Sequence, residues 1–208
     1  MLSPNVPVER VELRGKRVAL EPLSAEHLPG LAAAITDGRL WTIPVTLVPH
    51  PDTLAEFLTQ AETRYAAQLE RPFATIDLAS GAIVGSTRFM AINRDHRRVE
   101  IGFTFIAQRW QRSYVNTEAK YLMLRHAFEE WGCNRVELIT DVLNTKSRQA
   151  ILRLGAKEEG ILRNHMIMRD GRIRDSVLYS VIHSDWPLIK ANLEARIAAS
   201  EAGRGARP

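Results

Sequence analysis

The segment from residue 100 to residue 155 limits the fold of this chain more than any other feature. Its pattern predicts a strand, a turn, a helix, a second strand and a short helix, at residues 100–106, 108–114, 115–131, 135–140 and 144–155. A helix that begins directly after a strand points free backbone N–H groups and the positive end of its dipole outward. Arg109 and Arg112 stand in the turn before the longer helix. The segment therefore predicts a site for a ligand that carries phosphate groups, with a second helix start at Asn144 to hold another part of it.

The length and composition favour one domain over residues 1–208. With 45% apolar residues, a chain of 208 residues buries a full core without a metal or disulfide. We expect residues 1–10 to be an irregular lead-in and residues 199–208 to be a frayed tail. The single cysteine, Cys133, excludes an internal disulfide and fits a reducing compartment.

Charge and hydropathy exclude or weaken other classes of protein. No segment approaches the roughly 18 apolar residues that a membrane span needs, and the first residues lack the pattern of a signal peptide. We therefore expect a cytoplasmic protein that does not enter a membrane. The net charge of +4 is modest, so nucleic-acid binding is permitted but not required. A pocket for a polyanionic cofactor explains a local basic cluster equally well.

The remaining segments show two kinds of apolar periodicity. Short apolar or alternating runs predict strands at residues 17–22, 72–78, 83–92, 98–106, 157–168 and 174–182. Apolar stripes at helical spacing predict helices at residues 24–38, 53–69 and 185–197. Short turns join the strands between residues 72 and 106, so we expect an antiparallel meander there. Asp170 and Gly171 predict a hairpin between the last two strands.

Residues 41–51 contain three prolines, which excludes a regular helix. Trp41, at the start of this loop, either forms one wall of a substrate entrance or packs under an ordinary loop. Both interpretations of Trp41 stay open.

The order of these elements resembles that of the GNAT acyl-CoA N-acyltransferases. Within that superfamily the chain is most similar to the branch that contains the ribosomal-protein N-terminal (alanine or serine) acetyltransferases. The resemblance covers residues 14–197 and is carried by five motifs in the expected order: Glu-Ile-Gly-Phe at 100–103, Val-Asn-Thr-Glu-Ala at 115–119, the run at 144–156, Glu-Gly-Ile-Leu-Arg at 159–163 and Asp-Gly-Arg-Ile-Arg-Asp at 170–175.

The resemblance implies a fold and an activity. The fold is α/β (α+β), with a mixed central sheet of about seven strands flanked by helices, in which the fourth and fifth strands, residues 98–106 and 135–140, splay apart. The activity is acetyl transfer from acetyl-CoA to a primary amine of a protein N-terminus or a small molecule, by direct attack of the amine on the thioester. No metal is implied, and a homodimer is compatible with the family.

The resemblance also implies which residues bind acetyl-CoA. The pantetheine arm pairs with backbone groups of Phe105, Ile106 and Gln108 and contacts the second helix start. The diphosphate is held by the turn and the first residues of the longer helix. The candidate cofactor-binding residues are Phe105, Ile106, Gln108, Arg109, Arg112, Ser113, Tyr114, Val115, Asn116, Thr117, Asn144, Ser147 and Arg148.

The turn departs from the family pattern at two positions. Arg112 and Tyr114 stand where the family usually has glycines, which tolerate positive φ and allow a close backbone approach to phosphate. Two outcomes stay open. Arg112 swings outward and supplies charge-assisted hydrogen bonds, or the site binds coenzyme A weakly or not at all.

Four residues are candidates for the chemistry, two of them in reserve. Glu100 is the candidate general base and a substrate contact together with Trp41, because it stands on the strand beside the expected splay. Its alternative role is a polar residue on the other sheet face or a partner of Arg98. Ser147 is placed by the resemblance near the departing sulfur, although Asn144 and Ser147 also fit an ordinary helix cap. Tyr179, a hydroxyl acid, and Glu159 are reserve candidates.

Two other functions stay open at this stage. The replacements in the turn favour a non-catalytic protein that binds acyl-CoA. The scattered arginines give weak support to a nucleic-acid-associated protein, for which no motif is present.

Overall fold

Eight strands form one sheet in this computed structural model, which describes residues 9–202. The strands follow the order β1-β2-β3-β4-β5-β6-β8-β7, and every neighbouring pair is antiparallel except β5 and β6, which are parallel. The strands are β1 (Leu13–Arg14), β2 (Val18–Pro22), β3 (Arg71–Asp77), β4 (Ile83–Asn93), β5 (Arg98–Ile106), β6 (Arg135–Asp141), β7 (Lys157–Ile167) and β8 (Ile173–Ile182).

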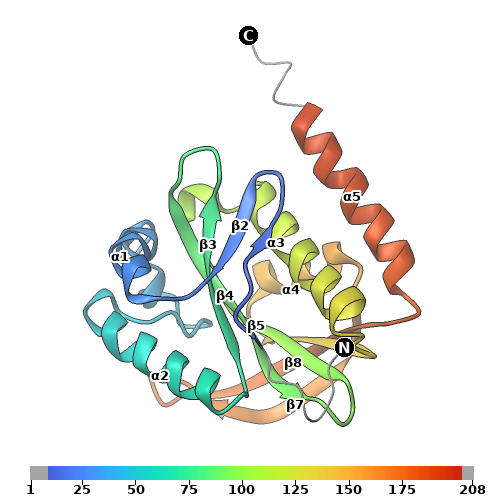
Figure 1. The fold of residues 1–208 in the computed structure, drawn as a ribbon. Helices are drawn as coiled ribbons and strands as arrows, with labels where there is room; N and C mark the ends of the chain where they lie inside the picture. The colour runs from blue at the N-terminus through green and yellow to red at the C-terminus, as the bar shows by residue number, and fades with distance from the viewer. Residues whose placement is uncertain (1–8, 203–208) are drawn as a thin grey trace.

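Helices cover both faces of this sheet. The α-helices are α1 (Leu28–Thr36), α2 (Leu54–Ala66), α3 (Tyr114–Arg125), α4 (Thr145–Leu154) and α5 (Trp186–Ala202). The short helices are η1 (Ala25–His27), η2 (Leu40–Thr42), η3 (Pro51–Thr53), η4 (Gln108–Trp110) and η5 (His126–Glu130). In Figure 1, α1 and α2 lie on one side of the strands, α3 and α4 lie on the other, and α5 runs along α3.

The two sides of the sheet have separate apolar cores. The larger core joins the sheet to α3, α4 and α5 and includes Leu122, Met123 and Leu193. The smaller core joins the sheet to α1 and α2 and includes Leu31 and Phe57. A side chain on β4 or β5 therefore faces either the α3 side or the α1/α2 side. The side that it faces decides which part of a bound ligand it can contact.

The expected fold class is confirmed, with corrections to single elements. The sheet has eight strands and not seven, because Leu13–Arg14 adds a two-residue strand, too short for a periodicity to reveal. The longer middle helix ends its α-helical part at Arg125 and continues as a π-helical turn, His126–Glu130, in which Trp131 N–H donates to the His126 carbonyl.

The last helix continues to Ala202 and not to 197, so residues 199–202 are helical and not a frayed tail. The rest of the expected tail, residues 203–208, and residues 1–8 of the expected lead-in lie outside the described part of the chain.

The parting of β5 and β6 is the feature that positions the site. These parallel strands pair only at Arg98 with Arg135, Val99 with Val136 and Glu100 with Glu137. Beyond Glu100, β5 stays paired with β4, and β6 stays paired with β8. The expected splay between the strands 98–106 and 135–140 is therefore present, and a gap opens between the two strands past Glu100.

No helix within residues 9–202 is long and apolar enough to cross a membrane.

Candidate functional site

Glu100 stands at the fork where β5 and β6 part. It is opposite Glu137, the last residue of β6 that pairs with β5. Burial raises the pKa of Glu100 to about 7, and the neighbouring negative charge of Glu137 raises it further than the distant Arg174 lowers it. A carboxyl group with such a pKa exchanges protons near neutral pH, as a general base must.

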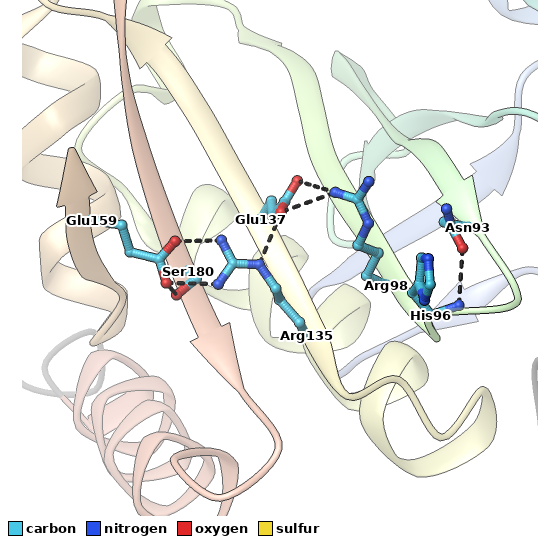
Figure 2. A network of polar contacts seen from close by, with 7 residues as sticks. All are labelled: Asn93, His96, Arg98, Arg135, Glu137, Glu159 and Ser180. Carbon is cyan, nitrogen blue, oxygen red and sulfur yellow. Dashed lines mark hydrogen bonds and ion pairs between the residues drawn. The ribbon is translucent and has the colours of Figure 1, made fainter. Parts of the chain in front are cut away.

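The carboxylates next to Glu100 are held in a chain of ion pairs, which Figure 2 shows. Arg98 donates to Glu137 at 3.3 Å, and Arg135 donates to Glu137 at 2.9 Å. Arg135 also forms a two-pronged contact with Glu159, which accepts a hydrogen bond from Ser180. At the strand turn in the same view, His96 N–H donates to Asn93 Oδ1 at 2.9 Å. Arg98 therefore pairs with Glu137 and not with Glu100.

Glu159 is in a different state from Glu100. Its hydrogen bonds from Arg135, with a smaller contribution from Ser180, lower its pKa to about 2. A carboxylate this strongly paired is a weak base. Of the two glutamates, the geometry favours Glu100.

The backbone of β5 borders the gap. Ala107 N–H donates to the Val84 carbonyl of β4 at 2.8 Å. Because N–H groups of successive strand residues point to alternate sides, Ile106 directs its N–H away from β4 and toward the gap. Phe105 pairs with Ser86 through its backbone and packs its ring against Phe57 on the α1/α2 side. The contact of Phe105 and Ile106 with a pantetheine arm stays a prediction.

The turn after β5 is tied to the end of α1. Gln108 N–H donates to the Asp37 carbonyl at 3.2 Å, and Arg109 donates to the Asp37 carboxylate from its backbone N–H at 3.0 Å and from Nε at 2.9 Å. The backbone hydrogen bond from Arg109 is the main cause that lowers the pKa of Asp37. Two N–H groups that the resemblance assigns to the cofactor thus already have partners within the protein.

Arg112 keeps the backbone shape that a glycine would give. Its φ is +59°, in the left-handed region, and its side chain is exposed. Ser113 follows as the N-cap of α3, with its hydroxyl accepting from Val115 N–H at 3.3 Å. The exposed arginine side chain agrees with the first of the two outcomes left open by the sequence, in which Arg112 swings outward.

Tyr114 does not enter the gap. Its ring is buried in the core on the α3 side, its hydroxyl donates to Asp77 at the end of β3, and the Arg17 guanidinium lies over the ring. Since β3 is two strands away from β5, this side chain points away from the gap. The second glycine position is therefore filled without blocking the groove.

The rest of the first turn of α3 divides between core and surface. Val115 is fully buried in the core, whereas Asn116 and Thr117 are partly exposed. Arg112, Ser113, Tyr114 and Thr117 line a hollow of about 360 Å³ together with Arg17, Arg196, Ile197 and Ser200. The hollow concentrates positive charge at the helix N-terminus.

The second helix start has the structure of a cap. Asn144 accepts a hydrogen bond from Ser147 N–H through Oδ1 at 3.1 Å. The Asn144 Nδ2 group and the Ser147 hydroxyl have no recorded partner within the described residues, which leaves both available to a ligand. The capping role is therefore confirmed, and the cofactor contact stays a prediction.

Arg148 and Tyr179 are engaged with each other. Arg148 Nε donates to the Tyr179 hydroxyl at 3.0 Å, and its other nitrogens donate to the Val142 carbonyl at 3.3 Å and to Glu158 at 3.2 Å. Tyr179 lies on β8, separated from the gap by β6. Burial raises the pKa of Tyr179. The structure thus brings Glu100 to the gap and keeps Tyr179 one strand away from it.

Trp41 belongs to a loop that meets the β7–β8 hairpin. Arg169 of the hairpin donates to the carbonyls of Trp41 and Thr46, both at 3.3 Å. Arg172 donates to the Pro44 carbonyl at 3.2 Å and to the buried carboxylate of Asp141 at the end of β6. The loop and the hairpin therefore form one joined border at the end of β6, and Trp41 also packs edge-on against His50.

The sequence matches the family described as the acetyltransferase (GNAT) domain over residues 17–157, which is more than half of the chain. The chain belongs to the GNAT family of N-acetyltransferases. The matched range of this GNAT chain begins before β2 and ends at the start of β7, so it contains the fork at Glu100 and both helix starts.

Individual relatives agree with this assignment. The protein named "Putative ribosomal N-acetyltransferase YdaF" from Bacillus subtilis is 31% identical over 169 residues, which cover 80% of this chain and 90% of YdaF. The protein named "Uncharacterized N-acetyltransferase YoaA", from the same organism, is 28% identical over 100 residues. The match covers 48% of this chain and 55% of YoaA, so this chain spans about half the length of YoaA.

Solved structures share the fold. A GCN5-related N-acetyltransferase from Brucella melitensis superposes with a TM-score of 0.82 at 32% identity, covering 94% of this chain and 89% of that one. RimJ of Mycobacterium smegmatis, in complex with CoA-disulfide, superposes with a TM-score of 0.75 at 20% identity, covering 86% of this chain and 88% of RimJ. At that lower identity the likeness to RimJ shows the fold alone.

Two contacts near the candidate site of this GNAT chain escape sequence patterns. Asp37 anchors the turn from 72 residues earlier in the chain. Lys120 lies buried in α3, where its ammonium group meets threonines of two different strands. Lysine in a helix ordinarily faces solvent. The one sign of burial in the sequence is that no charged residue stands three or four positions from Lys120.

Proposed function

We propose that the protein transfers an acetyl group from acetyl-CoA to a primary amine of a protein N-terminus or a small molecule. The observation that carries this proposal is the parting of β5 and β6 beyond Glu100. The gap lies directly before the N-terminus of α3 and has at its fork a carboxyl group with a pKa of about 7. Family membership supplies the reaction class.

The residues present fit coenzyme A. The hollow at the start of α3 is lined by Arg17, Arg112 and Arg196, beside helix N–H groups that favour phosphate. Tyr114 leaves the gap open because it bonds to Asp77. Asn144 keeps its amide nitrogen available for an amide arm in the gap.

Each group then has a task. Bound acetyl-CoA supplies a thioester whose carbonyl carbon accepts the amine. Glu100 takes a proton from the attacking amine, directly or through a water. Backbone N–H groups of β5, including that of Ile106, polarise the carbonyl oxygen. The departing sulfur needs a proton, for which the family resemblance offers the Ser147 hydroxyl as a first candidate.

The acceptor end of the site is bounded by the joined loop and hairpin. Trp41, Asp141 and Arg172 stand at this border. The name of YdaF, a relative at 31% identity, supports a ribosomal protein as the first acceptor to test.

A thiol-release assay tests the proposal. Purified protein with acetyl-CoA is offered a panel of amines: peptides that begin with serine or alanine, free amino acids, polyamines and amino sugars. We expect thiol release that depends on one class of amine and a product heavier by one acetyl group. Binding of acetyl-CoA without thiol release over the whole panel would instead favour a non-catalytic acyl-CoA-binding protein.

Location and assembly form the remaining part of the proposal. We expect a cytoplasmic protein and a homodimer, as the family resemblance allows. Light scattering coupled to gel filtration gives the mass in solution, and a mass of one chain at working concentration would contradict the dimer.

A further inference from the structure

Lys120 is a buried cation without a carboxylate partner. Its side chain points from α3 to the sheet, where Nζ donates to Thr87 Oγ1 of β4 at 2.9 Å and to Thr104 Oγ1 of β5 at 2.6 Å. The residue is 5% exposed. None of the ion pairs found within residues 9–202 includes Lys120.

Burying an ammonium group between two hydroxyls is unfavourable. Taking the charge out of water costs several kcal/mol unless an opposite charge compensates. A methionine at this position would fill the same space at no such cost. The burial, with no other cause, lowers the pKa of Lys120 to about 7. A buried ammonium group that is this unfavourable, and whose pKa is shifted close to neutral pH, points to a functional role.

Within residues 9–202, no charged side chain of the surrounding elements makes a recorded contact with Lys120, and burial is the only cause that shifts its pKa. On β4, Arg88 points to the opposite side, over the rings of Phe57 and Phe103. On β5, Glu100 alternates to that same opposite side, since its neighbours Val99 and Ile101 belong to the core under α3. On α3 itself, Glu118 accepts a hydrogen bond from Arg17 N–H.

In the described part of the chain, the other elements packed on α3 place no ion-pair partner at Lys120 either. β1, β2 and α5 contribute apolar side chains to this core, among them Leu13, Leu20 and Leu193. At the start of the helix, Asp77 is occupied by Tyr114 and Ser80. The protonation of Lys120 is therefore governed by burial and by whatever occupies the gap beside it.

Thr104 connects Lys120 to the gap. Thr104 is exposed and belongs to the part of β5 beyond Glu100, where β6 has parted. The strand is irregular here: Phe103 has φ of +50°, and the pairing with β4 shifts between Ser86 and Arg88. This bulge turns the Thr104 hydroxyl to the α3 side, and the contact of that hydroxyl with the Gly102 carbonyl is long, at 3.4 Å. The Thr87 hydroxyl lies 2.8 Å from the Thr104 hydroxyl, and when Thr87 is the donor of that pair the Thr104 proton is available to another acceptor.

Glu100 and the Lys120–Thr104 pair lie on opposite faces of the sheet at the same gap. A carboxylate on the α1/α2 face meets an amine arriving from the acceptor border. A donor on the α3 face meets the sulfur of a carrier whose diphosphate lies at the start of α3. Acyl transfer needs both a proton acceptor and a proton donor, and the fold separates them across the gap.

We propose that Lys120, acting through the hydroxyl of Thr104, supplies the proton that the departing thiol takes up. This proposal rests on the proposed function. The amine nitrogen forms a bond to the carbonyl carbon, the carbon–sulfur bond breaks, and sulfur leaves with the electron pair. Sulfur takes the Thr104 hydroxyl proton, Thr104 takes one from Lys120, and Glu100 takes the proton of the amine. After the products leave, Glu100 releases a proton to water and Lys120 regains one through Thr104.

A matched pair of threonine variants tests the route. The dependence of kcat on pH is measured for the wild type, Lys120→Met, Thr104→Val and Thr87→Val. We expect Lys120→Met and Thr104→Val to lower kcat by about 100-fold, with the KM for acetyl-CoA nearly unchanged. Both variants lose the decline of kcat that the wild type shows above about pH 7. Thr87→Val removes the buried hydrogen bonds of Thr87 to Lys120 and Thr104 but leaves the Thr104 hydroxyl at the gap, so this variant keeps an alkaline decline of kcat, although the midpoint of that decline can move.

A readout without turnover distinguishes this proposal from the proposed function. Lysine labelled with ¹³C at Cε reports the titration of Lys120 by NMR, and Lys120→Met identifies its signal. We expect one lysine to titrate near pH 7. Addition of coenzyme A shifts this titration in the wild type and in Thr87→Val, but not in Thr104→Val.

The outcomes are separable. A Lys120 signal that stays fully protonated up to about pH 9, or an alkaline decline of kcat that survives in Lys120→Met, overturns the role of Lys120. If the wild type releases no thiol with any amine, the proposed function fails, and the NMR titration with coenzyme A still decides whether Thr104 couples Lys120 to the gap.

Discussion

At the scale of single residues, the proposed chemistry depends on two groups whose ordinary charge states burial disfavours. The pKa of Glu100 is raised and the pKa of Lys120 is lowered, and for both residues the largest cause is removal from water. Glu159 differs from both residues, because it is held in an ion pair with Arg135. This contrast allows matched variants that change one kind of group at a time.

Glu100→Gln tests the base. We expect kcat to fall by about 100-fold or more, while acetyl-CoA still binds, because the amide keeps the shape of the carboxyl group. In the wild type, activity rises with pH through about 7, since Glu100 must lose its proton, and this rise disappears in the variant.

The control for this variant is Glu159→Gln. Because Glu159 is already ionised well below neutral pH, its replacement leaves the position of the pH profile in place. A Glu100→Gln protein that turns over normally at every pH would show that another group takes the proton of the amine.

Lys120→Met has a consequence for stability that does not depend on activity. The folded protein holds the pKa of Lys120 at about 7, against an ordinary value of 10.5. Between these two pH values the unfolded chain binds more protons than the folded one, so wild-type stability rises with pH across this window. We expect the variant to be more stable below pH 7, by on the order of 2–4 kcal/mol, and the advantage to shrink toward pH 10.

Urea unfolding at several pH values measures this difference. Lys157→Met, at an exposed lysine paired with Asp185, serves as the control and has no such pH-dependent gain. A Lys120→Met protein less stable than the wild type at pH 6 would contradict the assigned burial cost.

At the scale of elements, the turn between β5 and α3 shows how far a sequence pattern carries. The strand–turn–helix order is predictable, because strand and helix periodicities and cap residues are local. The conformation of Arg112 and Tyr114, which replace the two glycines, is not predictable in this way. Tyr114 turns away from the gap because of Asp77, 37 residues earlier in the chain, and Asp37 holds the turn through a contact of similar range. Contacts between residues so far apart in the chain produce no periodic pattern in the sequence, so they cannot be predicted from it.

Arg112→Gly separates the two outcomes that the sequence leaves open for this turn. Arg112 has φ of +59°, so glycine removes a left-handed penalty of about 1 kcal/mol. We expect acetyl-CoA binding to weaken about 5- to 10-fold in titration calorimetry, because a charge-assisted hydrogen bond is lost.

Arg112→Ala is the matched control, which loses the charge but keeps the strained backbone. It should bind as weakly as Arg112→Gly and unfold more easily. Tighter binding by Arg112→Gly would mean that close backbone approach matters more than the arginine charge.

The joined loop and hairpin predict a separate effect on the acceptor. Arg169→Ala removes two hydrogen bonds to the carbonyls of Trp41 and Thr46. We expect the KM for the amine to rise several-fold with the KM for acetyl-CoA unchanged, since Arg169 holds the loop at Trp41 and Thr46 and makes no hydrogen bond to residues 108–114 of the diphosphate turn within the described part of the chain.

Steady-state kinetics with each substrate varied in turn measures both constants. Arg163→Ala, at an exposed arginine of β7 with no recorded partner among residues 9–202, provides the comparison. An equal rise of both KM values would place the effect of Arg169 outside the acceptor border.

At the scale of the whole molecule, the sequence predicts the sheet and its parted strands, but not the two-sided division of its chemistry. The parallel pair follows from a helix that joins residues 98–106 to residues 135–140. The face to which each side chain points depends on the bulge at Phe103, which reverses the alternation within one strand. For that reason Glu100 is found from the sequence, whereas Lys120 and Thr104 become visible only in the structure.

The proposed acetyl transfer requires acetyl-CoA to lie in the gap between β5 and β6. Titration calorimetry of the wild-type protein with acetyl-CoA, beside Asn144→Ala, tests this most directly. We predict one site per chain with a Kd in the micromolar range, about 10-fold weaker in Asn144→Ala because the amide arm loses a hydrogen bond. No heat at submillimolar acetyl-CoA, or binding that the Asn144 replacement leaves untouched, would contradict it.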